Sequence, residues 1–174
     1  KCIDDMTMFP DKIKVLRFVG IGEPLLHKHI ADMVKYAVSK AVANTVEILT
    51  NASLLTPQLS DSLISSGLSR LVVSLQGTTQ DMYRKVCGID IDFEKFIQNL
   101  KYFFDNKGSA QVYIKIIDCA LNGREDEEKF YEIFGNFCDT IAIEHAVPIH
   151  SGVAYEDILK DKDNVQLIKE YLET

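Results

Sequence analysis

The feature that most constrains the fold is an alternation of short apolar segments with longer amphipathic ones along most of the 174 residues. The short segments are rich in β-branched residues, as strands are, and the longer ones repeat apolar side chains at helical spacing. The predicted strands are residues 13–19, 45–50, 70–75, 110–117 and 140–144. The predicted helices are residues 27–42, 57–66, 79–86, 92–107 and 125–137, with part of a helix at 1–9 and a last helix at 164–172.

Strands that alternate with helices imply right-handed crossover connections and therefore a parallel sheet. The third strand contains Leu71, Val72 and Val73 in succession, as expected for a strand that is covered on both faces. A doubly wound sheet and a partial barrel both fit this pattern, and the helix before the first strand favours the barrel. The predicted fold is α/β: a partial (β/α)6 TIM-like barrel in which five parallel strands are present and the first strand is missing. Residues 1–174 are predicted to form one truncated core domain.

The charge of the chain excludes some classes of partner. Nineteen basic and 26 acidic residues give a net charge of -7, and no basic cluster offsets it, so we expect no nucleic-acid partner. The longest apolar segments are strand-sized, so no membrane partner is expected either. The first residues contain no apolar leader, which predicts a cytoplasmic protein.

The four cysteines are dispersed along the chain, at Cys2, Cys87, Cys119 and Cys138. Reduced thiols are expected in a cytoplasmic α/β protein. None of the spacings is that of a metal site, so no metal ligand is predicted within the chain.

A turn of sequence Gly-Ile-Gly-Glu-Pro, residues 20–24, follows the first predicted strand. Glycine allows a ligand to approach the backbone closely, and ligands of parallel α/β proteins bind at the carboxyl ends of the strands. Glu23 places a carboxylate there, which suits an ammonium group. The same turn also occurs as an ordinary connection between a strand and a helix.

Four segments at strand ends, residues 18–26, 48–55, 71–77 and 83–88, together resemble radical S-adenosylmethionine (radical SAM) enzymes, of the kind related to molybdenum-cofactor and sulfatase-maturation proteins. The resemblance implies an iron-sulfur, oxidoreductase-like enzyme that binds SAM and generates a 5'-deoxyadenosyl radical. The expected partners are a small-molecule cofactor and an unknown substrate. The chain departs from the usual family pattern at Ile21, Ala52 and Cys87.

The resemblance also implies which residues bind the cofactor. Gly22 and Glu23 correspond to the turn that holds the amino group of SAM, and Ser74 to the hydroxyl that contacts ribose or carboxylate. The full predicted set is Gly22, Glu23, Pro24, Asn51, Ser74, Lys115 and His145. Lys115 would neutralise the SAM carboxylate, and His145 would face the adenine. Ordinary alternatives are a serine that satisfies a strand-end amide, a solvent-facing lysine and a histidine hydrogen-bonded at a strand end. No catalytic residue is assigned.

The three-cysteine loop that holds the 4Fe-4S cluster of such enzymes is absent from the sequence. The cluster ligands are therefore expected upstream of Lys1, and the chain by itself is expected to be inactive. Two alternatives remain: a non-catalytic module that binds SAM or a nucleotide, and a lyase-type βα-barrel enzyme with Glu23 as base and Lys115 as amine nucleophile. The open strand edge left by the missing first strand is expected to promote association.

Overall fold

The computed structural model describes residues 1–146, so the helix predicted at 164–172 lies outside the described residues. Its strands are β1 (Ile13–Phe18), β2 (Ala43–Thr50), β3 (Arg70–Leu75), β4 (Gln111–Ile117) and β5 (Thr140–Glu144). Its α-helices are α1 (Cys2–Met6), α2 (Ile30–Lys40), α3 (Pro57–Ser65), α4 (Gln80–Cys87), α5 (Phe93–Asn106) and α6 (Arg124–Phe134). Short 3-10 turns are η1 (Pro24–Leu26), η2 (Asp118–Ala120) and η3 (Gly135–Phe137).

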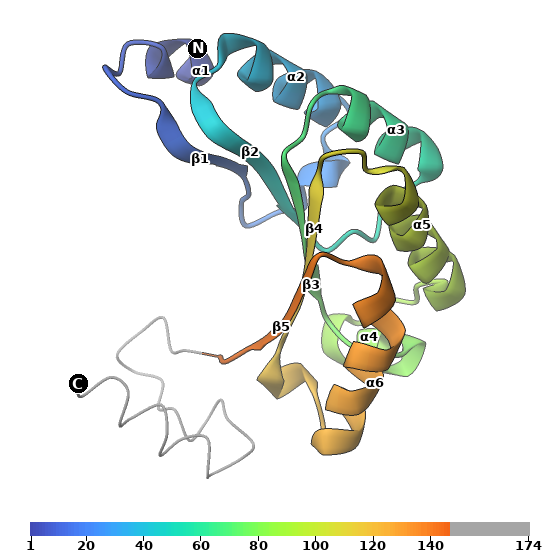
Figure 1. Cartoon of the computed structure of the whole chain (residues 1–174). Coiled ribbons are helices and arrows are strands. Elements are labelled where there is room, and N and C mark those ends of the chain that lie inside the picture. Colours follow the sequence, from blue (N-terminus) through green and yellow to red (C-terminus); the bar gives the residue numbers. More distant parts are fainter. Residues whose placement is uncertain (147–174) are drawn as a thin grey trace, which may run out of the picture.

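The five strands form one sheet in the order β1-β2-β3-β4-β5, and every neighbouring pair is parallel. The sheet is curved, and α2, α3, α5 and α6 lie on one side of it (Figure 1). The core fills the space between those helices and the sheet, where Leu71, Val73 and Ile114 of the strands meet Phe103 and Phe130 of the helices. The prediction of an α/β fold with five sequential parallel strands is confirmed.

Local sequence signals explain where α3 begins and ends. The Thr56 hydroxyl oxygen accepts a hydrogen bond from the Leu59 amide at 3.2 Å, and Pro57 occupies the first turn. Both features are favoured at a helix start, because the first amides of a helix lack partners within it. Beyond the helix end, Gly67 takes a φ of +84°, which glycine adopts at little cost. The helix predicted at 57–66 is therefore confirmed.

The other side of the sheet is concave, and no helix of residues 1–146 covers it (Figure 1). Residues paired across parallel strands point to the same face, and successive residues along a strand alternate between faces. Phe18, Ile48 and Leu71 occupy one register row and contribute to the helix-side core. The next row, Arg17, Glu47 and Arg70, therefore lies on the concave face.

Strand β1 pairs only with β2 within the described residues, so its other edge is open there. Val19 and Ile21, which follow β1, are exposed apolar residues. Association through this edge stays a prediction. In residues 1–146 there is no helix with both the length and the apolar character needed to cross a membrane.

Candidate functional site

A pocket of about 240 Å³ lies at the carboxyl ends of β1, β2 and β3. It is lined by residues 19–24 of the turn after β1, by residues 49–51, and by Ser74 and Gln76. Five of the seven residues predicted to bind the cofactor line it together: Gly22, Glu23, Pro24, Asn51 and Ser74. The carboxyl end of a parallel sheet is where α/β proteins bind their ligands.

The Glu23 carboxylate is fixed by three donors. Its Oε1 atom accepts hydrogen bonds from the Leu25 amide at 2.9 Å and from the Thr50 hydroxyl. Its Oε2 atom accepts one from the Asn51 amide at 2.8 Å. Glu23 therefore caps η1 and ties the end of β1 to the end of β2, a role that sequence reasoning missed. Each carboxylate oxygen accepts about two hydrogen bonds, so Oε2 retains room for one further donor, which fits an ammonium group.

Gly22 leaves part of the pocket open. A Cβ atom added there would meet nothing within 4 Å, and Gly22 is not among the glycines with positive φ. Neither packing nor backbone conformation therefore requires glycine at this position. The open space beside its backbone is where a ligand of the pocket would contact the turn.

Lys115 lies outside the residues that line this pocket, although its register partner on β3 is Ser74. Its ammonium Nζ forms an ion pair with Glu144 Oε2 at 2.6 Å, and the Tyr113 hydroxyl donates to Glu144 Oε1 at 2.9 Å. Burial acts to raise the pKa of Glu144, but hydrogen bonds from Lys115 and Tyr113 and the charge of Lys115 outweigh it and hold that pKa below its usual range. Lys115 is therefore not a solvent-facing lysine but part of a cluster on the concave face.

His145 also lies outside the residues that line this pocket. Its Nδ1 atom is 2.9 Å from Asp118 Oδ2, and Asp118 Oδ1 accepts from the amides of Cys119 at 2.7 Å and Ala146 at 3.0 Å. Asp118, at the end of β4, thus fixes the chain that leaves β5. Sequence reasoning missed this residue. The arrangement matches the alternative of a histidine hydrogen-bonded at a strand end.

The described cysteines do not fit a 4Fe-4S cluster. Within residues 1–146 no three His, Cys, Asp or Glu side chains are grouped so that they could hold a metal. Cys2 and Cys87 are exposed, and Cys119 and Cys138 are half-buried at other places in the fold. A cluster needs several thiolates at one place, so no step through a cluster can be assigned to these side chains.

Residues 6–134 match the model of the family described as Radical SAM superfamily. The sequence is 28% identical over 167 residues to a "Probable GTP 3',8-cyclase" of Saccharolobus solfataricus, a match that covers 92% of this chain and 52% of the relative. It is 30% identical over 116 residues to a "GTP 3',8-cyclase" of Chlorobaculum tepidum, which covers 67% of this chain and 33% of the relative. The chain spans about half the length, or less, of these curated relatives.

Solved structures share the fold. Coproporphyrinogen III oxidase (HemN) from Escherichia coli, a radical SAM enzyme, aligns with a TM-score of 0.66 at 14% identity, covering 98% of this chain and 43% of that one. Streptococcus suis SuiB, solved with S-adenosylmethionine bound, aligns with a TM-score of 0.63 at 18% identity, covering 91% and 35%. The predicted barrel-type fold, enzyme class and cofactors, SAM and a 4Fe-4S cluster, agree with the family match. Because that match covers most of its residues, the chain belongs to the radical SAM superfamily.

Proposed function

We propose that the pocket at the ends of β1, β2 and β3 binds SAM, and that the chain is the SAM-binding core of a radical SAM enzyme. The observation that carries this proposal is Gly22, a glycine that neither packing nor φ requires, beside the fixed carboxylate of Glu23. A site with an open backbone and one unused carboxylate position suits the ammonium group of an amino acid.

Each residue has a distinct role in this proposal. Glu23 Oε2 and the turn at Gly22 bind the ammonium group, while the Ser74 hydroxyl hydrogen-bonds to ribose. Asn51, whose amide is already bonded to Glu23, orders the pocket wall. In this family the bound cofactor supplies a 5'-deoxyadenosyl radical that removes a hydrogen atom from the substrate. The contribution of this chain is to bind and orient SAM and to keep water away.

Lys115 and His145 are proposed as outer contacts of the cofactor. Lys115 shares a register row with Ser74. The Lys115 ammonium forms an ion pair with Glu144, so a SAM carboxylate would bind Lys115 alongside the Glu144 carboxylate. His145 is held by Asp118, which leaves Nε2 as the ring atom available to a ligand.

One observation favours a second candidate, a SAM-binding module without catalysis: the described residues contain no group of cluster ligands. Reductive cleavage of SAM after anaerobic reconstitution with iron and sulfide, measured on a protein that includes any residues upstream of Lys1, distinguishes the two. The lyase alternative loses support, because Glu23 already accepts three hydrogen bonds and Lys115 is held in an ion pair.

The experiment that tests the proposal is calorimetric titration of Gly22→Ala with SAM. The added Cβ meets no protein atom, so the melting temperature should stay within about 2 °C of the original, as for other tolerated glycine replacements. SAM affinity should fall at least about tenfold, because the methyl group occupies ligand space.

Gly135→Ala is the matched control, since a Cβ there also meets nothing within 4 Å and Gly135 has no positive φ. It should retain both stability and SAM affinity. Wild-type affinity in the Gly22→Ala protein would contradict the proposed site.

A further inference from the structure

The concave face carries a row of charged residues that the SAM pocket does not use. Arg17, Glu47 and Arg70 are register neighbours on β1, β2 and β3. The Glu47 side chain is completely buried, with 0% of its surface exposed. A buried carboxylate is stable only when it is paired and hydrogen-bonded, and the two arginines provide this.

Glu47 uses only some of the arginine donors. Its Oε1 atom accepts a hydrogen bond from Arg17 Nε, and its Oε2 atom accepts one from Arg70 Nε at 2.7 Å and forms an ion pair with Arg70 Nη2 at 2.6 Å. Within residues 1–146, neither the Nη atoms of Arg17 nor the Nη1 atom of Arg70 donates a hydrogen bond. The arginine side chains are 47% and 32% exposed. Their unused N–H groups are therefore accessible while their positions are fixed.

The charge of the concave face differs in sign from that of the chain. By register and strand alternation, the charged residues on this face of the five strands are Arg17, Glu47, Arg70, Lys115 and Glu144. Three cations and two carboxylates leave it with one net positive charge, although the whole chain carries -7. Burial raises the pKa of Glu144 on β5, while the contacts of Lys115 and Tyr113 and the charge of Arg17 lower it. The positive charge of Arg17 on β1 therefore affects a carboxylate on β5, across the concave face.

We propose that Arg17 and Arg70, positioned by the buried Glu47, form a binding site for an oxyanion group of the substrate, a phosphate or a carboxylate. That the ligand of this site is the substrate of the enzyme rests on the proposed function. Guanidinium groups bind both kinds of oxyanion through paired N–H donors, and a fixed pair of them suits a multiply charged group.

The position of the row indicates which part of the substrate it holds. Arg17 and Glu47 lie two residues before Val19 and Leu49 of the pocket lining, about 7 Å of strand, and Arg70 lies four residues before Ser74, about 13 Å. The arginines would therefore anchor the end of the substrate that lies away from the site of hydrogen removal.

The test is calorimetric titration of the chain with two probes, inorganic pyrophosphate and succinate, at low ionic strength. At least one probe should bind saturably at one site. The probe with the higher affinity indicates whether the site prefers a phosphate or a carboxylate. Arg17→Gln should weaken binding at least about tenfold, the loss of charge-assisted hydrogen bonds. The SAM affinity of the same variant should change less than about twofold, because Arg17 lies outside the proposed SAM pocket.

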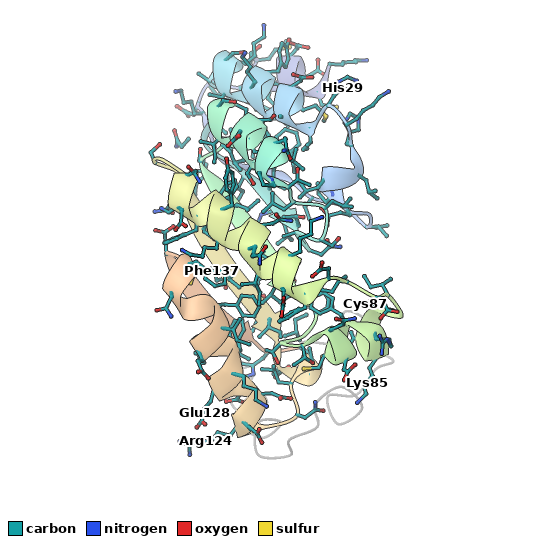
Figure 2. The ribbon with its side chains drawn as sticks, turned by 90° about the vertical axis from the view of Figure 1, so that its right-hand side faces the viewer. His29, Lys85, Cys87, Arg124, Glu128 and Phe137 are labelled. Carbon is teal, nitrogen blue, oxygen red and sulfur yellow. The ribbon has the colours of Figure 1, made fainter. Side chains whose placement is uncertain are left out.

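Arg124→Gln is the control, since Arg124 lies on the helix side at the start of α6, paired with Glu128 (Figure 2). It should bind the probes as the original protein does. If Arg17→Gln fails to fold by circular dichroism, Arg17→Lys keeps the charge and should still bind several times more weakly.

The proposed oxyanion site would be contradicted if neither probe bound saturably. It would also be contradicted if a folded Arg17 variant bound the probes as the original protein does. A failure of SAM to bind while the probes depend on Arg17 would instead contradict the proposed function and leave the oxyanion site standing.

Discussion

Replacing Glu47 by alanine is expected to lower the free energy of unfolding by about 3 kcal/mol, the lower end of what removal of one partner from a buried ion pair costs. The replacement leaves Arg17 and Arg70 side by side without the carboxylate that joins them. Both arginines are partly exposed and can recover some hydration, which is why the loss should lie at the lower end. Against a typical domain stability of about 5–15 kcal/mol, the effect is large. Urea denaturation at neutral pH measures it.

Glu128→Ala provides the comparison, because Glu128 is paired with Arg124 on the exposed surface of α6. Loss of an exposed ion pair between helix neighbours should cost only about 0.5 kcal/mol. If Glu47→Ala were as mild as Glu128→Ala, the row on the concave face would not be a stabilising ion-pair network. Should Glu47→Ala not fold, Glu47→Gln keeps the shape and should still be clearly less stable than the original protein.

Replacing Glu23 by alanine should have the largest effect on SAM binding, a loss of about 2–5 kcal/mol of binding free energy. The cause is twofold. The ammonium group loses its charged acceptor, and the amides of Leu25 and Asn51 lose the carboxylate that aligns the turn with β2. Calorimetric titration with SAM measures the loss.

Thr50→Val separates the two causes, because it keeps the carboxylate and removes only the hydroxyl that donates to Glu23 and accepts from the Ala52 amide. It should weaken SAM binding by less than about tenfold, as expected for a single neutral donor. Asp32→Ala, on the exposed surface of α2 where Asp32 contacts His29, should leave SAM affinity unchanged. If Glu23→Ala binds SAM as the original protein does, the role of Glu23 as ammonium anchor must be withdrawn.

Much of the fold followed from local sequence. The strands predicted at 70–75 and 140–144 have the bounds of β3 and β5. Strand β2 begins at Ala43, before the predicted residue 45, because pairing with Ile13 of β1 extends it into residues of weaker strand preference. The helix predicted at 27–42 is shorter as α2, since Pro24–Leu26 forms a separate turn and Ala41 takes a left-handed conformation. Local propensity predicts such elements well and their ends less well.

The candidate site was predictable only in part, because contacts between strands depend on register. The turn at residues 20–24 is a local pattern, and the structure brings it together with Asn51 and Ser74. The partners of Lys115 and Glu47 lie on neighbouring strands, and neither pairing has a local signal. A glutamate within an otherwise apolar strand was the one available sign of a buried ion pair. Asp118 gave no such sign.

The measurement that tests the central claim most directly is a crystal structure of the chain with SAM. The account predicts density for the cofactor in the pocket at the carboxyl ends of β1, β2 and β3, with its amino group within hydrogen-bonding distance of Glu23 Oε2 and its ribose beside Ser74. The space beside Gly22 should be filled. Density for SAM at another place, such as the hollow between α2 and α3 lined by Lys28, Lys35 and Ser62, would contradict it.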